Sequence, residues 1–238
     1  MSSRTFLRQR KQRPLKSIQA LAPGFVLCFD LAGIPYQEPA FSSIRKRIDD
    51  EDPDVIGIAY LLTRPEYERL LQSEGGRNGG YMEIDVEVKP LLDLTTEKER
   101  IICKSLETRE PRDNPHPLPS ARYLSLIRNG AAEHKFPAEY QEYLDNLSTY
   151  TITTWRTEIG RILFLLICLP IVLFVFTLMT LKDKHGELPR WVIRFQLMVY
   201  KTIWSLHDNY FSPIFGPGDI NQKEETDNAL CEKCFNQV

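Results

Sequence analysis

The sequence predicts an α+β domain, in which a small mixed or antiparallel sheet is flanked by helices, followed by a membrane helix. Two observations support this prediction. Over residues 1–148, short apolar runs separated by turn residues alternate with two or three amphipathic helical patterns. Residues 162–181 form an apolar run without a charged side chain, and a bilayer core about 30 Å thick needs roughly twenty helical residues.

The composition narrows the function classes. The chain has 238 residues and a net charge of −2, so it lacks the overall field that attracts nucleic acid, and we expect no nucleic-acid partner. The basic first sixteen residues contain Pro14 and no apolar run, unlike a secretory signal. We expect no metal and no cofactor, because Cys231 and Cys234 have no second ligand pair nearby. The five scattered cysteines indicate a reducing compartment.

Three regions follow from these patterns. Residues 1–148 form the soluble domain, residues 149–187 a connector with the membrane-embedded segment 162–181, and residues 188–238 an amphipathic helix with a polar tail. A buried core helix is the alternative for residues 162–181, but such a helix normally shows a polar stripe. Pro170 should kink the segment, which lipid-embedded helices tolerate. We expect a single-pass or embedded membrane protein whose domain is cytosolic.

Residues 190–210 have the pattern of an interfacial helix with aromatic anchors. Arg194, Lys201 and His207 interrupt the pattern as polar residues. A helix docked on the soluble domain is the alternative. The apolar residues expected on one face are Trp191, Phe195, Met198, Val199, Ile203 and Leu206.

Glu74 is the candidate catalytic carboxylate. Residues 54–62 read as a buried strand, and Thr63 and Glu66 form a capping box that begins a helix. Glu74 follows the apolar stripe of that helix to its C-terminal end. Burial and the negative end of the helix dipole should both raise the pKa of its carboxyl group toward the range of a general base or acid. The alternative is a helix-end side chain that reaches water.

Residues 81–89 alternate strictly between apolar and charged side chains, which predicts a strand with one face on the core. Residues 120–131 and 137–144 have the pattern of two further helices. Between the helix that begins after Thr63 and the strand at residues 81–89, the sequence contains Ser-Glu-Gly-Gly at 73–76 and Gly-Gly-Tyr at 79–81.

This ordered set of motifs resembles the γ-glutamylcyclotransferase family, in which a Glu-Gly ends a helix and a Gly-x-Tyr opens the next strand. Residues 121–144 resemble the later helical block of that family, and residues 24–29 its early strand. Residues 33–41 resemble a loop of its fungal members, which include relatives of gliotoxin-pathway enzymes and carry an apolar C-terminal extension. The resemblance covers residues 1–148 and implies a barrel-like sheet.

The resemblance also implies a reaction and a site. The α-amine of a γ-glutamyl group attacks its own γ-carbonyl, which closes the 5-oxoproline ring and expels the attached amine. The implied substrate is glutathione or a glutathione conjugate of secondary metabolism. Glu74 matches the catalytic Glu of the family, and Tyr81 and Tyr123 match its substrate-site tyrosines. Gly75 and Gly80 belong to the same substrate-binding block.

One departure leaves alternatives open. The family begins with a strand that leads into Tyr-Gly-Ser-Asn, whose backbone N–H groups bind an anionic group, whereas this sequence starts at residues that normally follow that motif. We expect the true start to lie upstream. The alternative function is a non-catalytic, membrane-anchored protein that binds a γ-glutamyl ligand. A lipid-active enzyme is a weaker option, because no Ser or Cys lies in a nucleophile-elbow context.

Overall fold

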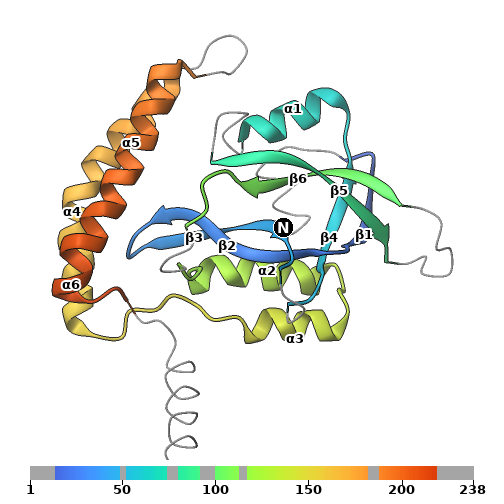
Figure 1. Ribbon diagram of the computed structural model, residues 1–238, viewed down its shortest axis with the longest axis horizontal. Helices are drawn as coiled ribbons and strands as arrows, with labels where there is room; N and C mark the ends of the chain where they lie inside the picture. The colour runs from blue at the N-terminus through green and yellow to red at the C-terminus, as the bar shows by residue number, and fades with distance from the viewer. Residues whose placement is uncertain are drawn as a thin grey trace, which may run out of the picture.

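The computed structural model describes residues 14–48, 52–73, 80–91, 100–112, 117–181 and 188–218. Figure 1 shows two parts: a domain of strands and short helices, and a pair of long helices beside it. The strands of the domain are β1 (Lys16–Ala22), β2 (Phe25–Ile34), β3 (Glu38–Lys46), β4 (Val55–Leu61), β5 (Tyr81–Pro90) and β6 (Ile101–Thr108). Its helices are α1 (Arg64–Ser73), α2 (Ala121–Glu133) and α3 (Ala138–Asn146).

The domain is α+β, as expected. Four strands form a sheet in the order β4-β1-β5-β6, and β2 and β3 form a separate hairpin whose second strand lies beside β6. Every pairing between the named strands is antiparallel, so the sheet is not mixed. The strands curl around a small core formed by Ala20, Ala22, Val86 and Val88. The barrel-like expectation is therefore met by a curled half-barrel (Figure 1).

The alternating pattern at residues 81–89 is confirmed, because Val86 and Val88 are buried in β5 while Glu83, Asp85 and Glu87 are exposed. The prediction of a loop at residues 33–41 is wrong. These residues form the end of β2, a tight turn and the start of β3. Tyr36 holds this turn in the left-handed region with φ 62°, which is uncommon outside glycine and needs support from the surrounding structure.

The capping box predicted at Thr63 is confirmed. The Thr63 backbone N–H and hydroxyl donate to Glu66 Oε2 at 3.1 and 2.8 Å, and α1 begins at the next residue. These bonds satisfy groups that a helix terminus would otherwise leave unpaired. Helices α2 and α3 pack together around Ala131, Tyr140 and Leu144 and lie under the β2–β3 hairpin (Figure 1).

The long pair consists of α4 (Trp155–Leu178) and α5 (Arg190–Leu206), which lie side by side (Figure 1). A short 3₁₀ turn, η3 (Met179–Leu181), follows α4, and a wide turn, η4 (His207–Phe211), leads from α5 into α6 (Ser212–Phe215). We call α4 and α5 the helical hairpin. Helix α4 begins at Trp155, seven residues before the start of the predicted membrane segment at Ile162.

The face assigned to residues 190–210 is partly wrong. Val199 and Ile203 are buried as expected, but Trp191 is 58% exposed and Met198 is 56% exposed. Val192 and Trp204 are buried in their place. Phe195 and Leu206 also pack against the core as partly buried side chains, so the buried face is rotated from the predicted one but overlaps it.

His207 is a second correction, because it is buried rather than a polar interruption on an exposed face. Its ring contacts the aromatic rings of Tyr36, Phe164 and Trp204. Its Nδ1 lies 2.8 Å from Asp208 Oδ1. A neighbouring carboxylate and aromatic rings give this polar side chain partners inside the fold.

Arg112 joins the domain to the helical hairpin. Its guanidinium donates two hydrogen bonds to Asp208, at 2.9 and 2.8 Å, and stacks 4.0 Å over the Trp204 ring. Trp204 Nε1 donates to the Gly33 carbonyl at 2.9 Å, and Tyr36 Oη donates to the Gly216 carbonyl at 2.7 Å. We call this set of contacts the junction. On the domain side it involves the end of β2, the β2–β3 turn and the segment after β6; on the hairpin side it involves the end of α5, η4 and the residue after α6.

Helix α4 is long and apolar enough to cross a membrane by length and composition. Only 28% of its most apolar window is buried within the described part of the structure. The buried positions, which form one stripe toward α5 and the turn, are Thr157, Gly160, Phe164, Cys168, Val172 and Val175. Membrane insertion itself stays a prediction.

Candidate functional site

Two of the predicted site residues, Tyr81 and Tyr123, meet at Ser42 in β3. Tyr81 Oη donates to the Ser42 carbonyl at 2.9 Å. Tyr123 Oη accepts from the Ser42 N–H at 3.2 Å and lies 2.8 Å from the Ser42 hydroxyl. The two tyrosines come from β5 and α2, so tertiary structure alone brings them together. Ser42 was not identified from the sequence.

An irregularity in the β2–β3 ladder lies opposite Ser42. Cys28 pairs with Ser43 and Leu31 pairs with Phe41, so two residues of β2 face one residue of β3. Such a bulge disturbs regular backbone pairing and changes the direction of nearby side chains. The tyrosine hydroxyls bond to the main-chain groups of the residue that faces it. Bulges are common next to functional sites, which supports a site at this place.

Tyr123 is fixed from two further directions. Ser120 is the N-cap of α2, and its Oγ accepts from the Tyr123 N–H at 3.0 Å. Glu38, which is largely buried, accepts from Ser120 Oγ and from Arg122 Nε, both at 2.7 Å. The Phe41 ring meets the Tyr123 ring edge-on, with 5.2 Å between centroids. These contacts restrict the rotamer of Tyr123 before any ligand binds.

A buried polar cluster lies directly behind this position. Asp30, in the bulge, accepts from the hydroxyls of Ser43 and Thr108 at 2.6 Å each. Cys28 Sγ donates to the same carboxylate at 3.3 Å. Burial raises the pKa of the Cys28 thiol to about 12, so this cysteine is not a thiolate nucleophile near neutral pH. The cluster ties β2, β3 and β6 together.

Gly80 lies against β2 immediately before Tyr81. A Cβ atom at this position would come within 2.7 Å of Leu31 Cδ1. The Gly80 carbonyl accepts from the Arg109 N–H at 2.8 Å, which extends the β5–β6 pairing to the start of the site. A side chain at residue 80 would push Leu31 away, so glycine allows the close approach.

Glu74 and Gly75 lie outside the described residues, and their predicted roles stay predictions. The last residue of α1 is Ser73. The Tyr67 hydroxyl of α1 donates to Glu83 of β5, so the helix that leads to Glu74 is fastened to the strand that begins with Tyr81. The predicted direction of the Glu74 pKa is likewise not addressed by the structure.

Within the described ranges, no group of three His, Cys, Asp or Glu side chains could hold a metal ion. The described cysteines, Cys28, Cys103 and Cys168, are free thiols. Cys231 and Cys234 fall outside the described residues. The polar groups that converge at Ser42 are hydroxyls and main-chain amides, which suit the positioning of an organic substrate through hydrogen bonds.

Comparisons with known proteins first define the class. Residues 54–144 match the AIG2-like family, and residues 154–214 match the AclK C-terminal domain. A solved structure titled "Gamma-glutamyl cyclotransferase" shares the fold, with a TM-score of 0.51 and 22% identity over 65% of this chain and 85% of that chain. Two family models thus match separate parts of the chain, one in the sheet domain and one in the helices that follow it.

Curated relatives then give the family. The chain is 33% identical to γ-glutamyl cyclotransferase gliK of Aspergillus fumigatus, over 90% of this chain and 84% of the relative. It is 34% identical to γ-glutamyl cyclotransferase gliK of Claviceps purpurea, over 92% of this chain and 99% of the relative. The chain belongs to the γ-glutamyl cyclotransferase family, and the resemblance inferred from the motifs is confirmed.

Proposed function

We propose that this protein releases 5-oxoproline from a γ-glutamyl amide, with a glutathione conjugate of fungal secondary metabolism as the natural substrate. The observation that carries the proposal is the meeting of Tyr81 and Tyr123 at Ser42. These are the two tyrosines that the family resemblance assigns to substrate binding. Their convergence from separate elements gives one place where a γ-glutamyl group can be held.

The reaction balances without a co-reactant. The α-amine nitrogen of the γ-glutamyl group bonds to its γ-carbonyl carbon, and the bond from that carbon to the attached amine breaks. The α-ammonium group loses a proton before the attack, and the leaving amine gains one. A single carboxylate can take the first proton and return it, so one general base and acid is sufficient.

Glu74 is the residue that we assign to this proton transfer. It follows α1 directly in the sequence, and α1 is held by the Thr63 capping box and by the Tyr67–Glu83 contact. The tyrosines and Ser42 would position the substrate so that its amine faces its own carbonyl. Holding reactants in a near-attack geometry can contribute several orders of magnitude in rate.

The proposed substrate class rests on the fungal relatives. The Aspergillus fumigatus and Claviceps purpurea proteins carry the name γ-glutamyl cyclotransferase gliK, and both extend over most of this chain, including the helical hairpin. The motif resemblance places such members beside gliotoxin-pathway enzymes. A glutathione conjugate differs from glutathione only at sulfur, so its γ-glutamyl end can undergo the same ring closure.

The test is a comparison of γ- and α-linked substrates. The full-length protein is incubated with glutathione, with S-benzylglutathione and with the α-glutamyl isomer Glu-Cys-Gly, and 5-oxoproline is measured by mass spectrometry. We expect release from the γ-linked compounds only, and faster release from the S-conjugate. Binding of the γ-linked compounds without any release of 5-oxoproline would contradict the proposal and favour the non-catalytic binding protein.

A further inference from the structure

The outer face of α4 is apolar from Ile162 to Phe176 and is not covered by the rest of the described structure. Leu166 is 67% exposed and Leu173 is 54% exposed. Large hydrophobic side chains that are similarly exposed on this helix are Ile159, Ile162, Leu163, Ile167, Leu169, Ile171, Phe174 and Phe176. Soluble monomers rarely expose an apolar patch that runs along an entire long helix.

The exposed stripe of α5 has a different character, because basic and apolar side chains alternate along it. Arg194 and Lys201 lie on an open groove of about 550 Å³ that Leu197 and Met198 also line. This groove is on the helical hairpin rather than beside the tyrosines. A helical surface that combines basic and apolar residues is typical of helices that lie at a membrane interface.

The charged residues of the hairpin are basic except for Glu158 of α4. From residue 159 to residue 181 and from 188 to 207, the sequence contains Arg161, Arg190, Arg194 and Lys201 but no Asp or Glu. The neighbouring Glu158 is paired with Arg161. A second copy of this surface would place like charges against like charges, whereas an anionic lipid headgroup complements them. The charge pattern therefore favours a bilayer over a homodimer.

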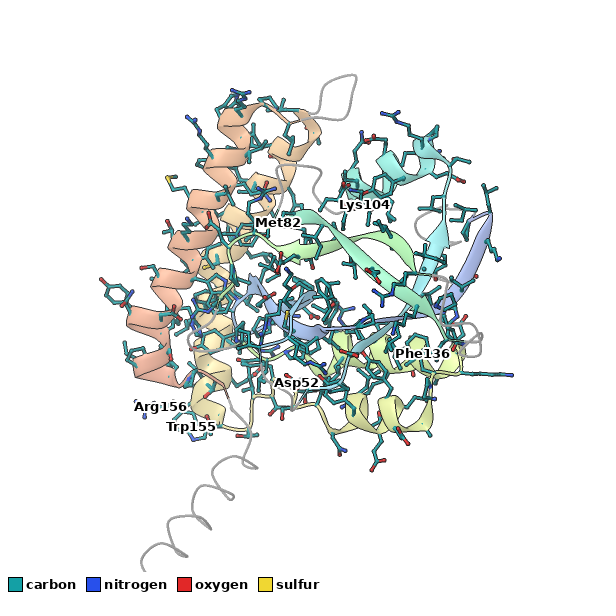
Figure 2. The ribbon with its side chains drawn as sticks, turned by 45° about the vertical axis from the view of Figure 1, so that its right-hand side comes forward. Asp52, Met82, Lys104, Phe136, Trp155 and Arg156 are labelled. Atoms are coloured by element: carbon teal, nitrogen blue, oxygen red, sulfur yellow. The ribbon has the colours of Figure 1, made fainter. Side chains whose placement is uncertain are left out.

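The hairpin also carries exposed tryptophans at its two ends. Trp155 begins α4 and is 77% exposed, and Figure 2 shows it with Arg156 at the end of α4 nearest to α6. Trp191 begins α5 at the opposite end and is also exposed. Tryptophan prefers the boundary between headgroups and acyl chains, so both ends of the hairpin are suited to a membrane interface.

The position of α5 argues against a crossing of the whole bilayer. Lys201 pairs with Glu110 of the domain at 2.8 Å, and the end of α5 is fastened to the domain through the junction. A spanning α4 would draw the antiparallel α5 into the bilayer with the exposed Arg194 and Lys201 on its surface. Charged side chains that face lipid at membrane depth are strongly disfavoured.

We propose that the helical hairpin binds one leaflet of an anionic lipid bilayer, with the outer face of α4 in the acyl-chain boundary and the basic residues of α5 at the headgroups. The domain then stays on one side of the membrane. Arg194 and Lys201 would extend their side chains toward headgroup phosphates while their aliphatic parts cover apolar surface.

Vesicle co-sedimentation of the full-length protein tests the bound surface. The probes are phosphatidylcholine vesicles with and without phosphatidylserine, and the key variant combines Leu166→Glu with Leu173→Glu. We expect the affinity of this double variant for the vesicles to fall by about tenfold or more. The control is Leu126→Glu, the same change at a 49% exposed leucine of α2, and it should bind like the unmodified protein. Equal binding by both variants would overturn the proposal.

The charge requirement is tested separately with Arg194→Gln combined with Lys201→Gln. Each basic residue near an anionic surface strengthens binding about fivefold, so the pair should lose most of the preference for phosphatidylserine. A preference that persists in this variant contradicts the assigned role of α5. Circular dichroism and thermal melting establish that each variant is folded. A different result would identify a second copy of the chain as the partner: the protein dimerises without lipid, Leu166→Glu abolishes the dimer, and no vesicle binding is observed.

The depth of insertion is tested by tryptophan quenching. A Trp155→Phe variant leaves Trp191 as the exposed tryptophan, since Trp204 is buried. Iodide added outside vesicles should quench Trp191 when the hairpin lies in one leaflet. Quenching that requires permeabilised vesicles would place Trp191 on the far side and contradict the one-leaflet arrangement.

Discussion

The sheet domain and the helical hairpin bury their apolar side chains to very different extents. In the domain, β5 directs Val86 and Val88 into the core and presents Glu83, Asp85 and Glu87 outward. In the hairpin, α4 presents apolar side chains both toward α5 and toward the outside. In β5, apolar side chains are thus buried and charged ones exposed, whereas the outer face of α4 is apolar and is not covered by the described residues.

The polar groups of the two parts differ in the same way. Around Ser42, the two tyrosine hydroxyls bond to Ser42, and a second set of hydrogen bonds joins the neighbouring Ser43 to the buried Asp30 carboxylate. On α5, Arg194 and Lys201 line an open groove, and Lys201 is paired with the exposed Glu110 of the domain. Fixed polar groups suit the positioning of a substrate, whereas exposed basic groups suit attachment to an anionic surface. The difference supports our two proposals, which assign the chemistry to the domain and membrane attachment to the hairpin.

The largest expected loss of stability comes from breaking the junction between the two parts. Asp208→Ala leaves the Arg112 guanidinium, whose side chain is 16% exposed, without its charged partner. We expect the free energy of unfolding to fall by about 2 kcal/mol, because a partly buried charge loses its compensation. Urea unfolding measures the change.

The control for this prediction is Glu110→Gln, which removes an exposed ion pair with Lys201 in the same region. Exposed pairs contribute only about 0–1 kcal/mol, so this variant should unfold almost like the original protein. Equal losses in the two variants would show that the Arg112–Asp208 contact does not hold the hairpin to the domain.

A smaller effect is expected from the contacts at Ser42. Tyr123→Phe removes the hydroxyl that bonds to the Ser42 N–H and hydroxyl. We expect kcat/KM for 5-oxoproline release to fall about tenfold, since a lost hydrogen bond costs about 1 kcal/mol or slightly more. Ser42→Ala combined with Tyr123→Phe should lose less than the sum of the single changes, because the residues share a contact.

The matched change on the hairpin is Tyr210→Phe, at an exposed tyrosine of η4. It should leave kcat/KM unchanged. An equal fall in activity for Tyr210→Phe and Tyr123→Phe would remove the distinction between a substrate-positioning domain and an attached hairpin.

The smallest effect is a pH dependence that arises at the junction. Burial lowers the pKa of His207 below its ordinary value of 6.5, and the nearby Arg112 acts in the same direction against the opposing effect of Asp208. The unfolded chain therefore binds a proton at His207 more readily than the folded chain does. Stability should be fully present above pH 6.5 and decline as the pH falls below it. Thermal melting over a range of about two pH units, from roughly pH 7.5 to 5.5, measures the slope.

His207→Phe should reduce this slope, because the titrating group is removed while an aromatic ring remains. A melting temperature that rises on acidification, or an unchanged slope in the variant, would contradict the assignment. Asp208 and Arg112 face His207 in the folded protein, so the comparison also includes Asp208→Asn to separate the histidine from its carboxylate neighbour.

The elements that the sequence predicted well are those whose patterns are local. The capping box at Thr63 and the alternation from Tyr81 onward depend on residues within a few positions of one another, and both are confirmed. The family resemblance likewise follows from an ordered set of short motifs, and the comparisons confirm it. Tyr81 and Tyr123 were selected through that resemblance, and the structure brings them together.

The features that the sequence could not predict depend on tertiary contacts. The role of Ser42 requires the bulge in β2, and no local signal in Ala-Phe-Ser-Ser indicates that ladder register. His207 has the composition of an exposed polar position, but Asp208 and three aromatic rings give it a buried environment. The orientation of α5 differs from the expected one because packing against α4 selects among faces of similar hydrophobicity.

The most direct test of the account is the rate of 5-oxoproline release by Glu74→Gln, with Glu68→Gln on α1 as the matched control. General acid–base catalysis contributes about 10²–10⁴-fold in rate. We predict that Glu74→Gln loses activity by about this factor while still binding S-benzylglutathione, and that Glu68→Gln turns over normally. Undiminished release by Glu74→Gln would contradict the central claim that this carboxylate performs the proton transfer.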